Sequence, residues 1–513
     1  MVLNVFGRKD QTLSEESKQF INSLPSTYVN LFRKRRQLLP VWGSHKYCAM
    51  IKSTFLIYYR ATNKPEESTT NCGQAPSPSL MHGFKYLNLQ NCTIRLIDDD
   101  AAGYVFCVIP ENGKGAIFFA AETEKDRAKF AQQAAAVQRH VPSITDFETL
   151  KLLGKGHYGR VILARGKADH HLYAVKEMKL NQVKAKVVYT ERSVMEWVAD
   201  HPFILGLDYA LARGKSVFLI SKFMSGGDLF LHMQNNGGCF TEDIVRFYGA
   251  ELLLALEHMH NMNILHRDIK PENVLLDVDG HIKLADMGLA KRLESRTGRT
   301  KTMCGTDTYL PPEMVGRYPS GHGLPVDMWQ FGCILFELRA GYPPFYIPQS
   351  SQKSTHQRIL YQAVRYPNNI SKDFKHLLVG LLEKKQEDRL GFNHGIAEIK
   401  AHPFFKGVDW NKVLRKETIA PLVPGPAGET LVNNFDPQFT EQPHQIYVAD
   451  EVIGGYERDF AGFDYVRAGM PVEGPRSDTQ SSSSSMSNSV KETIESSDEE
   501  KPEVDLETVT IKI

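Results

Sequence analysis

Eight consecutive residues near the middle of the chain, His266 to Asn273, constrain it more than any other stretch. They read His-Arg-Asp-Ile-Lys-Pro-Glu-Asn and follow a short apolar run. The loop presents a carboxylate, an ammonium group and a carboxamide, from Asp268, Lys270 and Asn273. Phosphoryl transfer from ATP needs this set: the carboxylate orients the attacking hydroxyl, the cation steadies the phosphate, and the amide oxygen can hold a bridging metal ion. Exposed loops are often rich in these residue types, but this order and spacing argue against chance.

A second set of motifs follows this loop. Asp286-Met287-Gly288 and Pro311-Pro312-Glu313 stand downstream, and Arg389 lies further on. Together with the loop, they resemble the catalytic loop, the Asp-Phe-Gly motif and the Ala-Pro-Glu motif of eukaryotic protein kinases. The resemblance implies an α+β, bilobal protein kinase fold with a β-rich N-lobe and an α-helical C-lobe over residues 147–405. Arg389 resembles the arginine that pairs with Glu313, a structural contact because breaking it would leave a buried charge.

A glycine-rich segment stands upstream of these motifs. Leu153 to Val161 contains Gly-x-Gly-x-x-Gly, whose glycines let backbone amides approach phosphates without a Cβ clash. Alone this pattern is weak, but Ala174-Val175-Lys176 follows at the distance of one strand. In protein kinases this lysine holds the α- and β-phosphates and pairs with a helix glutamate. Glu191, in an amphipathic run over 183–198, is the matching residue.

The kinase resemblance implies ATP and Mg²⁺ as cofactors and a specific set of site residues. The catalytic residues it implies are Asp268, Lys270, Lys176 and Glu191, and the metal ligands are Asn273 and Asp286. The residues that it implies for ATP binding are Leu153, Gly154, Gly156, Gly159, Val161, Ala174, Lys176, Lys222, Met224, Asp228 and Leu275.

The segment after Asp286 resembles a kinase activation segment. Thr302 is the implied phosphosite, with Arg267 and Lys291 as the cations that hold its phosphate. Thr306 resembles the threonine that bonds to the catalytic aspartate. The family's further histidine on the glutamate helix is absent, because Val187 stands nearby, so we expect the phosphate to be held less completely.

Three carboxylates, those of Asp228, Glu272 and Glu337, align with the groups by which arginine-preferring kinases bind arginines upstream of the acceptor. A desolvated arginine–carboxylate pair is strong and geometrically selective. The resemblance therefore implies a serine/threonine protein kinase acting on protein substrates with Arg three residues, and also five, before the acceptor. It implies an upstream activating kinase as a further partner.

The region behind the kinase-like segment resembles the C-terminal tail of the AGC kinases. Asn434-Phe435-Asp436 is one of its motifs, and Phe460 to Tyr465 matches the hydrophobic motif Phe-x-x-Phe-x-Tyr. In that family the phosphorylated motif docks beside the glutamate helix. Phe460 and Phe463 keep the aromatic part, while Asp464 stands in place of the phosphorylatable residue. Its charge is about −1 rather than nearly −2, so we expect docking without phosphorylation.

The N-terminal part is rich in strand-like runs. They lie at 28–32, 42–51, 54–59, 84–87, 93–97, 103–109 and 116–120, and an Ala- and Gln-rich helix is expected at 122–139. This pattern resembles a pleckstrin-homology domain, a β-sandwich or barrel closed by one helix, with Phe130 at the position of the usual aromatic. With the tail, it resembles most the protein kinase B (Akt, RAC) subfamily.

Basic residues gather at the end of the first strand. Arg33 to Arg36 and Lys46 could face a phosphoinositide headgroup, or they could be a solvated strand end, and the sequence weighs these two alternatives equally. Two further alternatives stay open for the whole chain: a pseudokinase-like scaffold, and an AGC kinase whose N-terminal domain binds only protein.

Composition limits the partners and the cellular compartment that we expect for this chain. The net charge of +1 argues against a nucleic-acid partner, and seven scattered cysteines without a Cys-x-x-Cys pair indicate neither zinc nor disulfides. Without a signal peptide or a long apolar run, we expect a cytoplasmic signalling phosphoprotein, peripheral at the plasma membrane. The expected organisation is a 1–25 extension, a 26–140 pleckstrin-homology-like domain, a 141–146 linker, a 147–405 kinase domain, a 406–470 AGC-type tail and a 471–513 disordered, Ser-rich acidic tail.

Overall fold

The structure is a computed structural model of the 513-residue chain. It describes residues 13, 15–24, 26–35, 41–61, 84–97, 103–110, 115–137, 142–156, 159–348, 352–424, 432–442, 460, 462–467 and 470. The chain divides into two units, Met1–Gly474 and Pro475–Ile513, and all described residues lie in the first. The predicted disordered tail and Arg36 lie outside the described residues. Among the described helices, none is long and apolar enough to cross a membrane.

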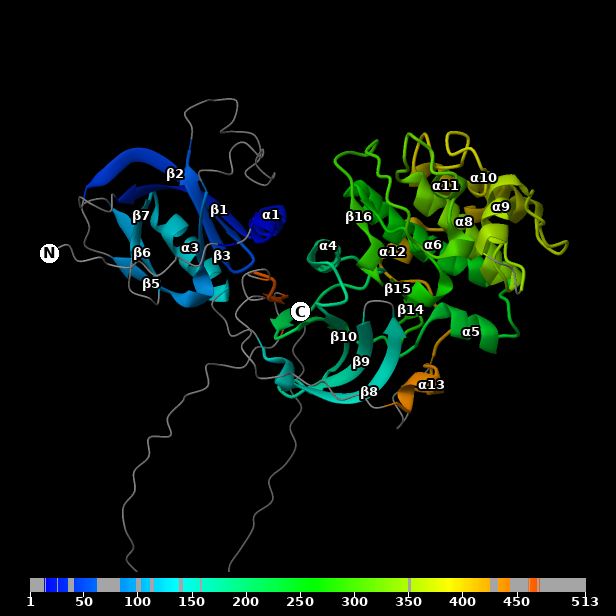
Figure 1. The fold of residues 1–513 in the computed structure, drawn as a ribbon, viewed down its shortest axis with the longest axis horizontal. Helices are drawn as coiled ribbons and strands as arrows, with labels where there is room; N and C mark the ends of the chain where they lie inside the picture. The colour runs from blue at the N-terminus through cyan, green and yellow to red at the C-terminus, as the bar shows by residue number, and fades with distance from the viewer. Residues whose placement is uncertain are drawn as a thin grey trace, which may run out of the picture. The chain divides into compact units, whose positions relative to one another are not determined.

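The N-terminal region forms one seven-stranded antiparallel sheet in the order β4-β3-β2-β1-β7-β6-β5 (Figure 1). Every strand expected from the sequence is present there, with ends shifted by a few residues. Its elements are α1 (Glu15–Ser23), β1 (Tyr28–Arg35), β2 (Trp42–Lys52), β3 (Phe55–Arg60), β4 (Lys85–Asn88), β5 (Cys92–Ile97), β6 (Tyr104–Pro110), β7 (Ile117–Ala121) and α3 (Glu124–Val137).

Aromatic side chains form the core between this sheet and α3. Phe130 of α3 is fully buried and stacks on Phe106 with ring centroids 4.2 Å apart. Phe32 meets both rings edge-on, and Phe119 completes the cluster. Burying a whole phenylalanine side chain stabilises a fold by about 1.5–3 kcal/mol, so these four rings hold the helix on the sheet. Continuous buried runs in β2, β3 and β6, rich in apolar and aromatic residues, explain why the sequence revealed these strands.

The first strand is longer than the sequence indicated. It was expected to end at Phe32, before the basic run, but β1 continues through Arg35 and pairs with both β2 and β7. Long cationic side chains can leave a strand for solvent or for aromatic faces while their backbone stays paired. Lys34 Nζ accordingly lies 5.5 Å from the Tyr47 ring centroid, and the Arg35 guanidinium lies 5.0 Å from that of Phe118.

The kinase region begins with a six-stranded antiparallel sheet in the order β17-β11-β12-β10-β9-β8, with α4 beside it (Figure 1). Five strands come from the N-lobe and the sixth, β17, from the C-terminal tail. The elements are β8 (Phe147–Gly156), β9 (Gly159–Gly166), β10 (Leu172–Lys179), α4 (Ala185–Trp197), β11 (Tyr209–Arg213), β12 (Ser216–Lys222) and β17 (Tyr465–Val466).

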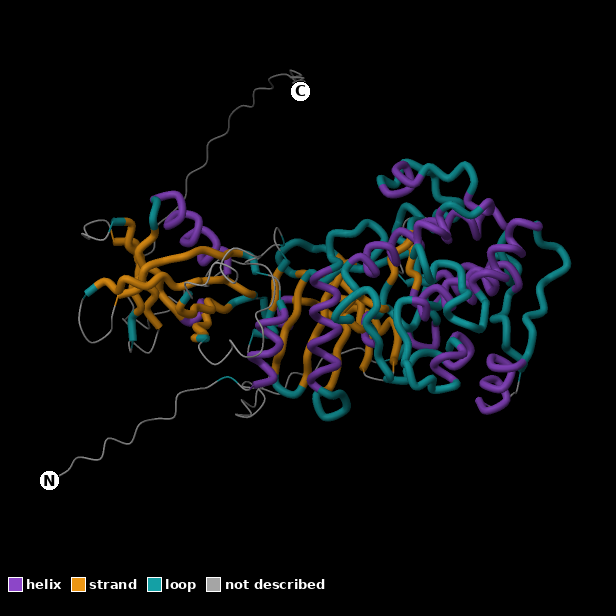
Figure 2. The backbone as a smooth tube through the Cα atoms, turned by 90° about the horizontal axis from the view of Figure 1, so that it is seen from above, coloured by secondary structure: helices purple, strands orange, loops and turns teal. Residues whose placement is uncertain are grey.

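The remainder of the kinase region is mainly helical, as the purple segments of Figure 2 show. Its central helix α8 is buried along most of its length, in agreement with the apolar run seen in the sequence. The elements are α5 (Leu229–Asn235), α6 (Glu242–Asn261), β13 (Ile264–Leu265), β14 (Val274–Leu276), β15 (Ile282–Leu284), β16 (Lys291–Arg292), α7 (Pro312–Val315), α8 (Pro325–Ala340), α9 (Gln352–Tyr361), α10 (Lys372–Leu381), α11 (Ile396–Lys400), α12 (Trp410–Leu414) and α13 (Pro437–Thr440).

A buried ion pair fixes the segment after the activation loop. Arg389 donates from Nη1 and Nη2 to the two carboxylate oxygens of Glu313, at 2.8 and 2.9 Å, and both side chains are fully buried. The pairing expected from the sequence is therefore confirmed. Because either partner alone would be an uncompensated buried charge, this contact holds α7 against the C-lobe.

Candidate active site

The catalytic loop is held from below by α8. Asp327 is fully buried, and its carboxylate accepts hydrogen bonds from the backbone amides of His266 and Arg267, at 3.0 and 2.9 Å. Gln330, one turn later, accepts from the amide of Ile269 and donates to the carbonyl of Arg267. These bonds satisfy backbone groups that would be costly to bury unpaired, and they fix the loop while Arg267 adopts a positive φ of 70°.

The structure brings the predicted loop residues together around Asp268. The Oδ1 atom of Asp268 accepts from the amide and the hydroxyl of Thr306, at 3.0 and 2.7 Å. Its Oδ2 atom lies 3.1 Å from both Lys270 Nζ and Asn273 Nδ2. The contact between Asp268 and Thr306 that the family resemblance implied is present. The carboxylate is thus held by four donors from two segments of the chain.

Three charged groups meet where the N-lobe faces the C-lobe. Lys176 Nζ of β10 donates to Glu191 Oε1 of α4 at 2.6 Å and to Asp286 Oδ1 at 2.8 Å. Burial would lower the pKa of Lys176, but the two carboxylates outweigh it and raise that pKa above its ordinary value. At Asp286, burial raises the pKa of the carboxyl group, but the charge of Lys176 lowers it by more. The pKa of Asp286 therefore falls to about 2. Lys176 and Asp286 are therefore charged at neutral pH, while burial raises the pKa of Glu191 against the lowering effect of Lys176.

The two predicted metal ligands offer suitable donor atoms. Asn273 donates through Nδ2 to Asp268, which leaves its amide oxygen as an acceptor. Asp286 is ionised and stands at a positive φ of 60°. An amide oxygen and a carboxylate suit Mg²⁺, which proteins commonly bind through one or two carboxylates together with phosphates. The described residues contain no cluster of three or more His, Cys, Asp or Glu able to hold a metal ion.

The glycines of the β8–β9 hairpin differ in their surroundings. A Cβ on Gly159 would lie 1.9 Å from the carbonyl oxygen of Glu177, so only glycine fits there. Gly154 has open space at the corresponding position, and Gly156 has no heavy atom nearer than 4.0 Å. The hairpin can therefore approach β10 closely at one end while its other glycines face an open space in which phosphates could lie.

An apolar cluster beside this hairpin includes residues of the tail that were not among the predicted ATP-binding residues. Leu153 packs with Leu163, Phe223 and Val432, and partly buried Val161, Ala174 and Phe435 adjoin them. Phe435 of the tail stacks on Phe223 with centroids 5.4 Å apart, and Asn434 donates to the carbonyl of Ser225. Of the other predicted ATP-binding residues, Met224 is buried, Lys222 is exposed and Leu275 forms a backbone bridge with Asp228. The Asn-Phe-Asp motif could have revealed the tail's contribution.

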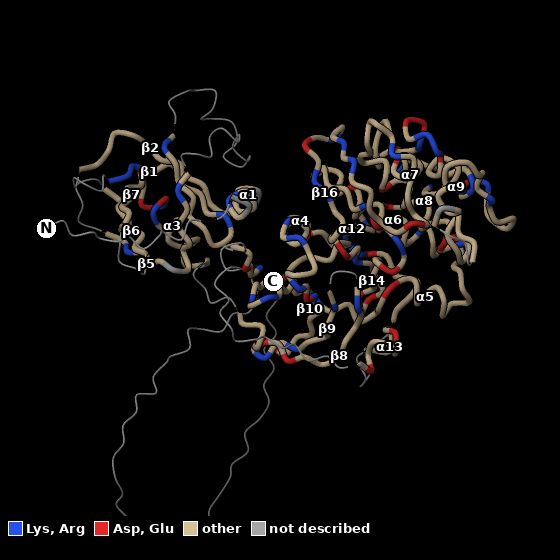
Figure 3. The backbone as a smooth tube through the Cα atoms, in the orientation of Figure 1, with Lys and Arg blue, Asp and Glu red and all other residues tan. Residues whose placement is uncertain are grey.

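The three predicted arginine-binding carboxylates influence one another. Asp228 caps α5 by accepting from the amide of Leu231 at 2.8 Å, and Glu272 is exposed. Glu337 is only 4% exposed and accepts a hydrogen bond from the Tyr309 hydroxyl. Burial, and then the charge of Glu272, raise the pKa of Glu337 to about 7. Acidic segments beside β14 and α5 mark this region in Figure 3.

The group of cations around Lys291, near the start of the activation segment, is larger than predicted. Arg267 is 6% exposed; its Nε donates to the carbonyl of Leu289, and its Nη1 is buried with no partner among the described residues. Burial, then Lys186 and Arg267, lower the pKa of Lys291, so Lys186 of α4 is a third cation of this group. The family resemblance concerned the position near Val187 on this helix, and no motif in the sequence marks Lys186 beside it. Thr302 is exposed.

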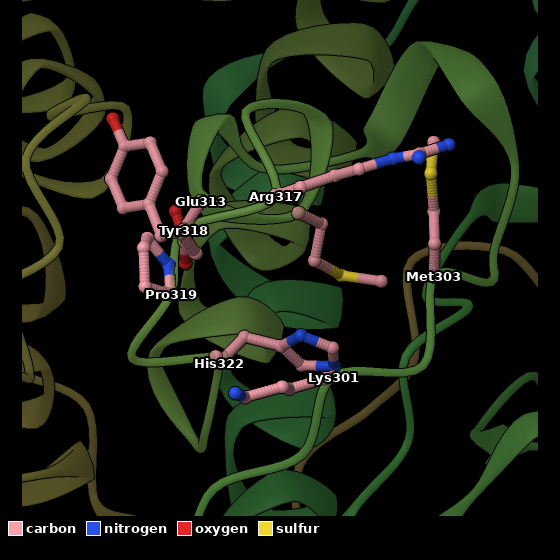
Figure 4. Close-up of a pocket in the computed structure, with 9 residues that line it drawn as sticks. Lys301, Met303, Glu313, Arg317, Tyr318, Pro319 and His322 are labelled. Carbon is pink, nitrogen blue, oxygen red and sulfur yellow. The ribbon is translucent and has the colours of Figure 1, made fainter.

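A separate cavity of about 350 Å³ opens between the activation segment and the loop after α7 (Figure 4). Lys301 and Met303 line one side, and Arg317 and Tyr318 line the other. His322 at its wall is 2% exposed, and its Nε2 has no hydrogen-bond partner among the described residues. Burial lowers the pKa of His322 to about 4, so the imidazole is neutral at pH 7.

The tail's hydrophobic motif lies against α4 and β11. Phe463 is fully buried and Phe460 is 7% exposed; both rings pack on Tyr189 of α4, with centroids 5.9 and 5.2 Å away. Asp464 accepts from the amide of Ala212 at 2.8 Å and from Arg213 Nη1 at 2.7 Å. The strand β17 follows at once and pairs with β11.

Comparison with known proteins agrees with this fold and site. Residues 147–405 match the protein kinase domain family. The serine/threonine-protein kinase Sgk1 of Gallus gallus, of Mus musculus and of Homo sapiens is 39% identical to the chain over 303 residues, which covers 58% of this chain and 69% of each relative. The chain therefore belongs to the protein kinase family. More particularly, it is an ATP-dependent serine/threonine protein kinase of the AGC type.

The contacts of the tail predict how its variants behave. We expect Phe460→Ala/Phe463→Ala to lower basal activity several-fold, because each ring contributes about 1.5–3 kcal/mol when fully buried. Asp464→Asn should lower it modestly, since one partly exposed ion pair is lost. The rate of peptide phosphorylation is measured for enzymes that carry the same amount of phosphate on Thr302. The double variant Ile419→Ala/Val423→Ala, at two exposed positions, is the control. Equal activity of the double-Phe variant and the parent would show that docking of the tail does not support catalysis.

Proposed function

We propose that this protein transfers the γ-phosphate of ATP to Ser or Thr in arginine-containing protein segments, with Asp268 as the group that orients the acceptor hydroxyl. The observation that carries the proposal is the pairing of Lys176 with Glu191 at 2.6 Å, together with the anchored Asp268. A lysine held in this way can bind the α- and β-phosphates without reorganising.

The other loop residues have roles that follow from their positions. Asp268 can accept the proton of the attacking hydroxyl, and Lys270, 3.1 Å from it, can neutralise charge on the moving phosphoryl group. Asn273 and Asp286 would hold Mg²⁺, which neutralises phosphate charge when it is bound. Leu153, Val161, Ala174 and Leu275 would sandwich the adenine, and backbone groups from Lys222 to Met224 would bind its edge.

The alternative of a pseudokinase-like scaffold has less support. A scaffold could lose any member of the catalytic set without loss of fold, yet all five members are present. Lys176 contacts Glu191 and Asp286, and Asp268 contacts Asn273. Placing the partly buried Lys176 beside two carboxylates, one of them buried, costs desolvation energy. Such a charged arrangement favours a catalytic role.

We further propose that phosphorylation of Thr302 by an upstream kinase switches the enzyme on. The support is the buried Nη1 of Arg267, which lacks a partner among the described residues, with Lys291 and Lys186 nearby. A phosphate could pair with these cations through charge-assisted hydrogen bonds and so order the activation segment. Because Lys186 lies on α4, the same phosphate would also pull on the helix that carries Glu191.

The catalytic assignment predicts the effect of one isosteric change. Asp268→Asn should lower turnover at least about 100-fold, because a positioned base and an aligned hydroxyl typically contribute that much. Peptide phosphorylation by the purified full-length variant measures it, with Asp388→Asn on the C-lobe surface as the matched control. Under conditions in which the parent enzyme is phosphorylated on Thr302, the Thr302→Ala variant should also lose most of its activity. Near-normal turnover of Asp268→Asn would overturn the assignment.

The acidic region supports a preference for arginine before the acceptor. Asp228, Glu272 and Glu337 lie close enough to shift one another's pKa, and together they would attract guanidinium groups. Arginine binding requires the ionised carboxylate, and the pKa of Glu337 is about 7. Glu337 is neutral below that pH and charged above it, so binding an arginine peptide should release a proton from it.

This linkage predicts a pH-dependent KM. For a peptide with Arg three residues before the acceptor, KM should fall as pH rises from about 6 to about 8, while a peptide with Ala there should show a flat profile. Glu337→Gln should flatten the profile of the arginine peptide and weaken its preference, because a carboxamide does not titrate. A peptide array that showed preference for proline or acidic residues would contradict this use of the three carboxylates.

For the N-terminal region, we propose a pleckstrin-homology-like domain that is recruited by phosphoinositides, with contact to protein alone as the alternative. The seven-stranded sheet closed by α3 supports the fold, and Arg33 lies opposite Lys46 across β1 and β2. Part of this charge is already engaged, since Lys46 pairs with Glu122 and Lys34 lies over two rings. A headgroup would therefore have to compete with Glu122 for Lys46.

Vesicle flotation of the full-length protein decides between these alternatives. Vesicles that contain phosphoinositides should bind it, and Lys46→Ala should weaken binding by about fivefold, since one basic residue near an anionic surface contributes about 1 kcal/mol. Lys125→Ala, on the exposed surface of α3, is the control and should bind like the parent. Binding that does not depend on phosphoinositide, or no binding at all, would favour a domain that contacts only protein.

A further inference from the structure

The N-terminal helix α1 contacts the helix that carries Glu191. Both belong to the compact unit Met1–Gly474. Phe20 is 5% exposed, and its ring centroid lies 4.1 Å from that of Tyr189 on α4. The guanidinium of Arg192 lies 5.0 Å from the Phe20 ring centroid. Tyr189 therefore packs against Phe20 of α1 as well as against Phe460 of the tail, and α4 is held by both segments.

The β2–β3 turn contacts the tail itself. Ser53 stands at the turn with a φ of 50°, and its hydroxyl lies 3.3 Å from the carbonyl oxygens of Gly462 and Asp464, to one of which it donates. Gly462 sits between the two motif phenylalanines. A Cβ there would lie 2.8 Å from Phe55 and 3.2 Å from Ile21, and its φ is 79°. Glycine at this position lets the N-terminal region approach the tail closely.

A buried lysine joins α1 to the β2–β3 turn. Lys52, only 3% exposed, donates to the carbonyls of Asn22 and Leu24 at 2.7 Å each, at the end of α1. Asn22 in turn donates to the hydroxyl of Tyr86 on β4. These bonds satisfy the terminal carbonyls of the helix and tie it to the sheet. The helix α1 and the β2–β3 turn therefore meet α4 and the tail as one rigid surface.

From these contacts we propose that the N-terminal domain is a positioning element for catalysis: through Phe20 and Ser53 it holds α4 and the docked tail so that Glu191 keeps its bond to Lys176. The proposal rests on the proposed docking of the tail. Tyr189 and Arg192, which receive the contacts, flank Glu191 on the same helix, so a shift of the helix would lengthen the 2.6 Å bond. A group pre-ordered in this way needs no rearrangement when ATP binds.

The contact that the β2–β3 turn makes through Ser53 lies far from the basic residues Arg33 and Lys46. The strand β2 runs from Trp42 to Lys52, and Lys46 lies six residues before the end that leads to Ser53. At about 3.3 Å per residue, that end is roughly 20 Å from Lys46. Binding an anionic headgroup at Arg33 and Lys46 therefore leaves the α4 contact free to persist. The domain would activate the kinase while bound to a membrane, rather than inhibit it until released.

The experiment compares full-length variants, all phosphorylated on Thr302, in steady-state kinetics with ATP varied. Phe20→Ala should raise KM for ATP and lower kcat so that kcat/KM falls about tenfold, because the ring that packs on Tyr189 is lost. Phe20→Leu should recover most of this loss. Leu96→Ala, an exposed apolar position on β5 at the far edge of the same sheet, should behave as the parent. Amide exchange over 185–197 should be faster in Phe20→Ala and normal in Leu96→Ala.

Each other result would overturn the proposal. Higher activity of Phe20→Ala would make the domain an inhibitor, and unchanged kcat/KM would leave the contact without a role in catalysis. If Phe20→Ala lowered only the fraction of enzyme that is active, and left KM for ATP and amide exchange over α4 unchanged, the variant would merely be partly misfolded. Phe463→Ala, assayed alongside, separates this proposal from tail docking: if it loses activity while Phe20→Ala does not, the tail docks and only the positioning role fails.

Discussion

The bond between Lys176 Nζ and Glu191 Oε1, 2.6 Å long, joins the N-lobe sheet to α4 and makes the position of that helix decisive for the site. Without Lys176, Glu191 would be a buried carboxylate without compensation, because its side chain is only 3% exposed. Asp286 adds a second carboxylate to the same lysine and so ties the C-lobe to the pair. The three groups fix the geometry in which phosphates can be received.

Several segments that are distant in sequence converge on α4. Phe463 reaches it from the tail, with its carbonyl accepting from Arg192 Nε at 2.7 Å across 271 residues of sequence. Phe20 reaches it from the N-terminus, and Lys186 at its own start faces the activation segment. The helix itself has no side-chain cap at its N-terminus. Because its stability comes from packing rather than from its own termini, its position responds to each of these segments.

The catalytic loop depends on a different kind of support. Asp327 and Gln330 of α8 bind its backbone amides, and α8 is among the most buried helices described here. The loop is therefore rigid for reasons internal to the C-lobe, whereas Glu191 is placed by contacts that can be changed. This division lets the chemistry stay fixed while regulation acts on one helix.

The sequence by itself determined the catalytic set and most elements of both sheets. Asp268, Lys270 and Asn273 lie within one loop, and short runs of apolar, aromatic and β-branched residues mark the strands of the N-terminal sheet, because these signals are local. Even so, β1 ran three residues past its expected end, since cations such as Lys34 pack on aromatic faces that only the folded sheet supplies. Tertiary structure alone placed Lys186 near enough to Lys291 to lower its pKa, Val432 against Leu153, and Ser53 on a tail 411 residues away. Such contacts depend on the packing of distant segments, and packing leaves no period or spacing in the chain from which to read them.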